Sequence, residues 1–459
     1  MIMNKNGRNS NMSKVSETTH LTEAAKMVLE MADKLGASQA EVSLGSEEGL
    51  SVSVRLGELE TLEFHQGKSA SITVYLGKRC ATASTTDLSH DSLQKTVQAA
   101  HDMAQFTEED PCFGLADKSL LVKEYPDLQQ DHPWSVDAKT ATNWAIESEK
   151  KALALDKRIV NSDGISLSTH RSFGVYANTH GFCGHALETD HMLSCSLVAQ
   201  DGKDMQRASD YTFAYDPKRL KSMDDVAFTA AKKAIRQLNP RKMPTQKSSI
   251  VFDGEIAASL IGAFISAISG GNLYRESSFL LNHLGQPVFP DWIDIIEDPH
   301  QKNTIGASPF DAEGVLTRKK HFIRDGILES YALGSYSARR LKLETTANAG
   351  GVYNVSLVSK KEEHCLASQE ALLKKMDKGI LVTSLMGSSV SILTGDYSRG
   401  AMGFWVENGE IQYPVHEFTI ASNLKDMFMS IEAIAQNIDE RKNIKTGAIL
   451  LSNMMIAGE

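Results

Sequence analysis

The sequence predicts an α+β protein of two domains: an N-terminal α/β domain with a mostly antiparallel sheet, and a C-terminal β-rich domain with a few helices. Three observations support this prediction. A chain of 459 residues exceeds what one hydrophobic core ordinarily supports. Apolar residues recur at helical spacing in some segments and alternate as in strands in others. The stretch at residues 239–245 has two prolines, and such linkers are typical of domain boundaries.

Composition and charge exclude several classes of protein. The chain has 48 basic and 58 acidic residues, a net charge of −10, which argues against a nucleic-acid-binding protein. The longest apolar run, Ile256–Ile268, is shorter than the ~20 residues that span a bilayer. The five cysteines are an odd number without disulfide-like spacing and favour a reducing compartment. Residues 1–20 lack the apolar core of a signal peptide and are expected to be a disordered tail. We expect a cytoplasmic protein without membrane contact.

The N-terminal domain is expected at residues 21–240. Helical spacing of apolar residues predicts four helices, at Leu21–Leu35, Ser89–Gln105, Asp137–Leu155 and Ser222–Leu238. Alternating segments predict strands at Ala40–Leu44, Leu50–Leu56, Glu58–His65, Ser69–Leu76, Arg79–Ser84 and within Ile159–Val198. The order helix, strands, helix therefore occurs twice, either as an internal repeat or as two halves of one sheet.

The C-terminal domain is expected at residues 241–459 and opens with a strand, Ser249–Phe252. The helix predicted next, Glu255–Ser269, is almost entirely apolar. We expect it to be buried nearly all round, because most of its circumference is covered by Ile256, Leu260, Ile261, Phe264, Ile265 and Ile268. Further strands are expected within Gly306–Leu333, and a helix at Ser368–Lys378.

The stretch Gly387–Asn423 has the densest strand and turn signals and is expected to form the core of this domain. Alternation predicts strands at Ser389–Leu393, Gly403–Glu407, Glu410–Tyr413 and Val415–Ile420. Asn408-Gly409 predicts a type I′ hairpin turn with positive φ at both residues. Pro414 is expected to end a strand, because proline cannot donate to a ladder. A helix is expected to follow from Asn423 to about Ile438.

Few residues form a recognisable catalytic or metal pattern. The sequence contains no His-Glu-x-x-His, Cys-x-x-Cys, P-loop or Gly-x-Ser-x-Gly motif, so no catalytic residue is assigned. The remaining metal candidates are His180, Cys183, His185 and His191, since imidazole and thiolate suit zinc. Their irregular spacing favours the simpler interpretation that they line a sheet surface.

A second candidate site lies among the predicted turns of the C-terminal core. Asp396, Tyr397 and Arg399 are expected between two strands, where they could hold a peptide or a partner protein. A solvated turn explains the same residues equally well.

Several motifs together resemble those of the TldD/PmbA family. The longest is Leu393–Val415, LTGDYSRGAMGFWVENGEIQYPV, and shorter ones are Ser335-Tyr-Ser-Ala-Arg339, Ala349-Gly-Gly351 and Ser84-Thr-Thr-Asp-Leu-Ser89. The resemblance covers the chain from about Leu21. It implies a bacterial cytoplasmic protein that forms a heterodimeric metalloprotease with a TldD-type catalytic subunit. The implied substrates are unfolded peptides, such as microcin precursors and labile antitoxins.

The chain departs from the family pattern where zinc would be bound. The resemblance implies a His-Glu-x-x-x-His helix and a late Cys-Gly pair in the TldD subunit, where imidazoles hold zinc and bound water becomes a nucleophile. The corresponding helix here, Glu255–Ser269, contains no histidine, and the late pair reads Thr446-Gly447. We therefore expect no cofactor in this chain and zinc in the TldD-type partner.

Three functions stay open at this point, and with them the question whether the chain is itself an enzyme. The first is a non-catalytic subunit that completes the substrate cleft by pairing an extended peptide with a sheet edge. The second is a zinc metallopeptidase in its own right, using His180, Cys183, His185 or His191. The third is a peptide-binding scaffold that works without TldD. A homodimer in the absence of the partner is a further alternative.

Overall fold

The computed structural model describes residues 6–387 and 389–459 and has an α+β fold, as predicted. The N-terminal half forms one antiparallel six-stranded sheet in the order β3-β2-β1-β4-β5-β6. Its strands are long: β1 (Gln39–Arg55), β2 (Glu58–Leu76), β3 (Arg79–Thr85), β4 (Ile159–Asn178), β5 (Cys183–Asp201) and β6 (Asp204–Ala214). The two predicted helix–strand–helix units are thus two halves of one sheet.

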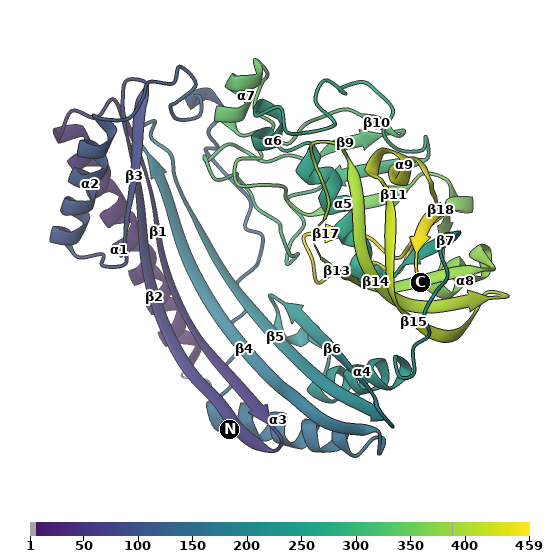
Figure 1. The fold of residues 1–459 in the computed structure, drawn as a ribbon. Helices are drawn as coiled ribbons and strands as arrows, with labels where there is room; N and C mark the ends of the chain where they lie inside the picture. Colours follow the sequence, from purple (N-terminus) through teal and green to yellow (C-terminus); the bar gives the residue numbers. More distant parts are fainter. Residues whose placement is uncertain (1–5, 388) are drawn as a thin grey trace.

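Four helices cover one face of this sheet, as Figure 1 shows: α1 (Asn6–Lys34), α2 (His90–Ala104), α3 (Ala138–Leu153) and α4 (Met223–Arg236). Side chains of α1 and α2 form one core with one end of the sheet. Side chains of α3 and α4 form a second core with its other end. The opposite, concave face is turned toward the C-terminal half (Figure 1).

The C-terminal half contains two sheets with helix α5 (Gly254–Ala267) packed between them. The larger sheet is made of β7 (Gln246–Phe252), β12 (Cys365–Leu366), β13 (Gly379–Met386), β14 (Asp396–Glu407), β15 (Glu410–Asn423), β16 (Ile431–Ala435) and β18 (Ile449–Ala457). Because β18 also pairs with β7, five of these strands close into a barrel. The smaller sheet contains β8 (Ile293–Glu297), β9 (Lys320–Arg324), β10 (Ile327–Leu328), β11 (Val355–Ser359) and β17 (Ile444–Lys445).

The remaining helices are short: α6 (Gly270–Tyr274), α7 (Ser335–Leu341), α8 (Gln369–Met376) and α9 (Leu424–Met429). Aromatic rings fill the centre of this half, with Phe289 stacked on Phe428 at 4.7 Å between ring centroids and Phe264 edge-on to Phe289 at 5.2 Å. No helix among the described residues combines the length and apolar character needed to cross a membrane.

Several predicted elements need correction. Residues 6–20, expected to belong to a disordered tail, are part of α1, while residues 1–5 lie outside the described residues. Ser389–Leu393 is not a strand; of this segment only Val390 forms a bridge, with Tyr397. The segment lies between Gly387 and Gly395, both with positive φ, which fold the chain back on itself.

The strand expected to end at Pro414 continues through it as β15. Strand β15 pairs with β18 only at Thr419–Ala421, so no β18 residue lies opposite Pro414. The missing N–H of Pro414 therefore leaves no carbonyl group of β18 without a hydrogen bond. The next helix, α9, ends at Met429 instead of continuing to Ile438. The following residues form β16, because pairing with β18 buries Ile431 and Ala433 and leaves Glu432 exposed.

Candidate functional site

Helix α5 meets the N-terminal half of the chain at its first turn, where Glu255 pairs with Lys233. It begins at Asp253, whose side chain accepts a hydrogen bond of 2.9 Å from the backbone N–H of Glu255. One face enters the core through Ala257, Leu260, Ile261, Phe264 and Ala267. On the other face Ser259 is exposed, and Gly262, Ala263 and Ser266 are half-buried. The helix is therefore largely buried, as expected, although this stripe of small residues reaches the surface at Ser259 and Ile256 and Ile265 are only half-buried.

Strand β17 runs beside this stripe. The Cδ1 of Ile444 lies 3.8 Å from the position that a Cβ on Gly262 would take, an ordinary van der Waals distance. Thr446 follows β17 and is buried. A Cβ on Gly447 would lie 2.2 Å from the carbonyl oxygen of Ala435, so only glycine fits there. The helix and the late residue pair singled out by the family resemblance thus belong to one region.

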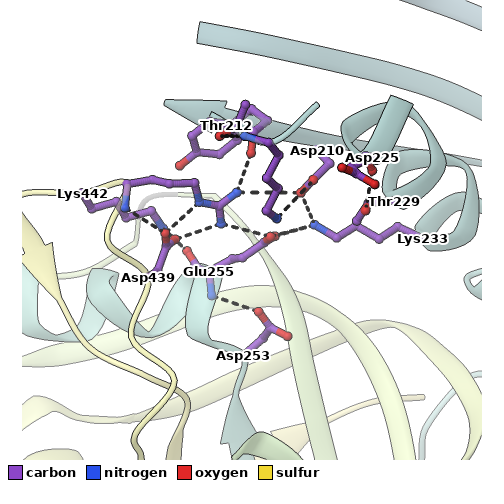
Figure 2. Close-up of polar contacts among 12 residues, drawn as sticks. Asp210, Thr212, Asp225, Thr229, Lys233, Asp253, Glu255, Asp439 and Lys442 are labelled. Carbon is purple, nitrogen blue, oxygen red and sulfur yellow. Dashed lines mark hydrogen bonds and ion pairs between the residues drawn. The ribbon is translucent and has the colours of Figure 1, made fainter. Parts of the chain in front are cut away.

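An ionic network joins the first turn of α5 to both halves of the chain (Figure 2). Lys233 of α4 donates to Glu255 Oε1 at 2.7 Å and to Asp210 of β6 at 2.9 Å. Arg441 donates to Glu255 at 3.1 Å and to both oxygens of Asp439, at 2.7 and 2.9 Å. The network therefore connects β6 and α4 of the N-terminal half with α5 and the loop before β17.

These charged groups hold one another ionised. Burial raises the pKa of Glu255, but the hydrogen bond and charge of Lys233 and the charge of Arg441 keep it below its usual value overall. Burial lowers the pKa of Lys233, yet its bonds to Glu255 and Asp210 leave it raised. Burial likewise raises the pKa of Asp439, and Arg441 more than reverses this. The only carboxylate of α5 is thus committed to ion pairs and is not available as a general base.

A pocket of about 400 Å³ opens next to this network, between strand β6 and the segment that leads into β17. Its lining includes four cations, Arg219, Lys221, Arg441 and Lys445, against one carboxylate, Glu440. Such a pocket is large enough for a small ligand or the end of a peptide.

The four metal candidates do not come together. His180 contacts Gln39 Nε2 at 3.1 Å and the carbonyl oxygen of Ala116 at 2.8 Å. His191 is fully buried and bonded through both ring nitrogens, to Thr169 Oγ1 at 2.8 Å and to the carbonyl oxygen of His132 at 3.0 Å. Both histidines are therefore engaged within the fold.

Cys183 and His185 are exposed on one face of β5, as their spacing predicted. Six residues of strand, roughly 20 Å, separate His185 from His191. Over residues 6–387 and 389–459, no three His, Cys, Asp or Glu side chains gather closely enough to hold a metal ion.

The candidate peptide- or partner-binding residues lie at the start of β14 and not in a turn. Tyr397 is buried in the core, and burial raises its pKa to about 12. Asp396 is exposed and accepts a hydrogen bond of 2.6 Å from Thr394. Arg399 donates to the carbonyl oxygen of Gly387 at 3.1 Å. Tyr397 is therefore part of the hydrophobic core, whereas a binding role for Asp396 and Arg399 stays a prediction.

Comparison with known proteins decides the family. Models of the three PmbA/TldA metallopeptidase domains match residues 40–104 (domain 1), 131–238 (central) and 245–458 (C-terminal). The chain is 44% identical to the protein named metalloprotease PmbA of Escherichia coli O157:H7, over 96% of each chain. It is 42% identical to a metalloprotease PmbA homologue of Haemophilus influenzae, over 99% of this chain and all of that one. The chain belongs to the PmbA/TldD family.

Solved structures show the same fold. A putative modulator of DNA gyrase from Bacteroides thetaiotaomicron superposes with a TM-score of 0.89 at 25% identity, covering 95% of this chain and 98% of that one. TldE from Thermococcus kodakarensis superposes with a TM-score of 0.83 at 20% identity, covering 95% of this chain and all of that one. As a PmbA/TldD family member, the chain thus has relatives named metalloproteases but a histidine-free α5.

The sequence patterns did not reveal the ionic network or the cationic pocket. The network is built from four separate segments of the chain, which contribute Asp210, Lys233, Glu255 and Arg441. In the sequence, each of these residues looks like an ordinary charged surface residue. The nearest sequence signal was the late pair Thr446-Gly447, which directly follows the pocket residue Lys445.

Proposed function

We propose that this chain is the non-catalytic subunit of a heterodimeric peptidase and completes the substrate cleft beside a TldD-type subunit that carries the zinc. The observation that supports this most strongly is the chemistry of α5. The stripe of Ser259, Gly262, Ala263 and Ser266 offers no histidine or carboxylate to zinc, and the only carboxylate of the helix is held by Lys233 and Arg441. Small side chains along this half-buried stripe permit close approach of an extended peptide or of elements of a partner.

The outer end of β2 offers an edge to a partner. Residues 58–69 pair with β1, whereas pairing with β3 begins only at Ala70, and no other described strand pairs there. Three apolar side chains of this segment are exposed: Leu59 (46%), Leu62 (44%) and Phe64 (72%). An unpaired edge with exposed apolar residues favours docking of another chain.

The reconstituted peptidase tests the proposal. Hydrolysis of an unstructured peptide is measured with this chain alone, with the TldD-type subunit alone and with their mixture. We expect activity only in the mixture. Hydrolysis by this chain alone, or full activity of the other subunit alone, would contradict the proposal.

Variants of the β2 edge test the association separately. Phe64→Lys should weaken co-purification with the TldD-type subunit, because it places a charge on the docking surface. Met205→Lys changes a residue on β6 of comparable exposure (58%) and should leave co-purification unchanged. Equal recovery of both variants would show that this edge is not the contact.

A further inference from the structure

The cationic pocket is a built cavity with chemically distinct walls. Residues Thr212–Tyr215 of β6 and its following turn form one wall. The segments 301–305 and 438–445 form the others, and Arg219 lies at the side. The pocket thus lies between the two halves of the chain, and its lining residue Arg441 donates to Glu255 in the first turn of α5.

Lys445 is the unusual residue of this pocket. It is 7% exposed, yet among the described residues it forms no ion pair within 4.0 Å, and Glu440 and Asp298 act on its ammonium group only from further away. Nζ donates one hydrogen bond, to Asn354 Oδ1. The amide of Asn354 is fixed because its Nδ2 donates to the carbonyl oxygen of Asp298 at 2.6 Å. Since lysine is rarely buried without an anionic partner, the ammonium group has unused capacity to bind an anion.

The neighbouring charges leave the pocket electropositive. Arg441 is neutralised by Asp439 and Glu255. Among the described residues, Glu440 is the one carboxylate that pairs with Arg219, at 2.9 Å, and Arg219 also donates to the carbonyl oxygen of Asn303 at 2.6 Å. Glu440 is 69% exposed in its side chain, so an incoming anion can replace it at little cost. The pocket therefore favours a negatively charged ligand.

Other atoms of the lining narrow the class of anion. Asn303 Oδ1 is buried and has no hydrogen-bond partner among the described residues, so it can accept from a ligand N–H. Phe213, Tyr215, Ile305 and Ile438 add apolar surface. An anionic group, an adjacent N–H donor and an apolar side chain occur together in the carboxyl-terminal residue of a peptide. An inorganic anion would use only the cations.

We propose that this pocket binds the carboxyl terminus of a peptide, with the carboxylate on Lys445 and Arg219, the last amide N–H on Asn303 and the last side chain against Phe213 and Tyr215. The proposal rests on the proposed function, because it assigns the peptide to the cleft that this chain completes. It anchors the end of an extended chain beside α5 without reading its sequence. This suits a subunit that holds unfolded peptides of varied sequence.

Direct binding to the full chain tests the proposal without any peptidase activity. An unstructured peptide labelled at its N-terminus and ending in leucine is prepared as the free acid and as the C-terminal amide, and binding is followed by fluorescence anisotropy. We expect the acid to bind about tenfold to a hundredfold more tightly than the amide, since a charge-assisted hydrogen bond is lost. Lys445→Met should reduce this preference, since only Arg219 is then left to bind the carboxylate, and Asn303→Ala should weaken binding of both peptides.

The matched control is Lys247→Met, which removes an exposed lysine of β7 in the same half of the chain and should keep the preference. Equal affinity for acid and amide, no binding of either, or an intact preference in Lys445→Met would overturn the proposal. Displacement of the peptide by inorganic phosphate at lower concentration than by unlabelled acid peptide would also overturn it, in favour of a phosphate site. This assay measures binding and not hydrolysis. A pocket that does not bind the peptide carboxylate is therefore distinguished from a chain that does not form a heterodimeric peptidase, which the reconstituted peptidase tests.

Discussion

Replacing Arg441 with methionine tests whether the ionic network holds the two halves of the chain together. The Arg441 side chain is 15% exposed, and its guanidinium group bonds to Asp439, Glu255 and the carbonyl oxygen of Tyr211, the last at 2.8 Å. It also lies 4.3 Å from the centroid of the Tyr211 ring. Methionine keeps most of the apolar stem and removes the charge, so the change isolates the electrostatic contribution.

The size of the effect follows from the groups left behind. Asp439 is 9% exposed and would keep Lys442, at 3.5 Å, and the backbone N–H of residue 441, at 3.1 Å, while Glu255 would keep Lys233. Removing one partner of a buried ion pair costs about 3–5 kcal/mol, and the remaining lysines place the loss near the lower value. At about 2–4 °C per kcal/mol for a domain of this size, the Tm should fall by roughly 6–12 °C.

The chain contains a matched control with the same spacing. Arg158 donates to both oxygens of Asp156, two residues earlier, at 3.0 and 2.7 Å, but these side chains are 40% and 26% exposed. An exposed ion pair contributes little to stability, so Arg158→Met should have the same Tm as the wild type in a calorimetric scan. If Arg441→Met also has the wild-type Tm, the network does not stabilise the fold and the reasoning is wrong.

Three further predictions concern folding and metal binding. Gly409→Val should lower the Tm, because a β-branched residue at φ 72° is strained by about 1–3 kcal/mol; an unchanged Tm would show that the hairpin tolerates it. The triple variant Gly262→His, Ala263→Glu, Ala267→His should bind zinc weakly by elemental analysis. The variant should also be destabilised, mainly because Ala267 is buried and a histidine there would leave polar groups unsatisfied, at about 1–3 kcal/mol per group. A stable variant that binds zinc tightly would contradict this. Burial lowers the pKa of Lys445 to about 8 from 10.5. Between these two pH values the unfolded chain binds more protons than the folded chain, so the free energy of unfolding rises with pH, by about 3 kcal/mol in total. Lys445→Met should remove this rise between urea titrations at pH 7 and pH 10.5, and an unchanged rise would exclude Lys445 as its source.

Local signals in the sequence predicted the parts of the fold that local hydrogen bonds determine. Ser89 caps α2 by accepting from the backbone N–H of Ser92, three residues away. Asn408 and Gly409 have positive φ values of 55° and 72°, as the predicted turn requires. Such features depend on residues that are neighbours in the chain, so one sequence suffices to find them.

The features that the sequence did not predict depend on contacts between segments that are distant in the chain. Ala40–Leu44 and Leu50–Leu56 were predicted as separate strands, but they belong to the single strand β1, which pairs with β2 and β4 on either side. Gly49 interrupts the pattern because the rings of His65 and His170 occupy the place of its side chain; a Cβ there would lie 2.3 Å from His65 Cε1. The ionic network has the same origin, since its members meet only in the folded chain.

Crossed removal of zinc tests the central claim most directly, namely that this chain contributes no metal to catalysis. Each subunit is treated separately with a chelator, freed of it, and mixed with the untreated form of the other subunit in zinc-free buffer. We predict full peptide hydrolysis when only this chain has been treated and none when only the TldD-type subunit has been treated. Loss of activity on treating this chain alone, restored by adding zinc, would contradict the account and place a catalytic metal here.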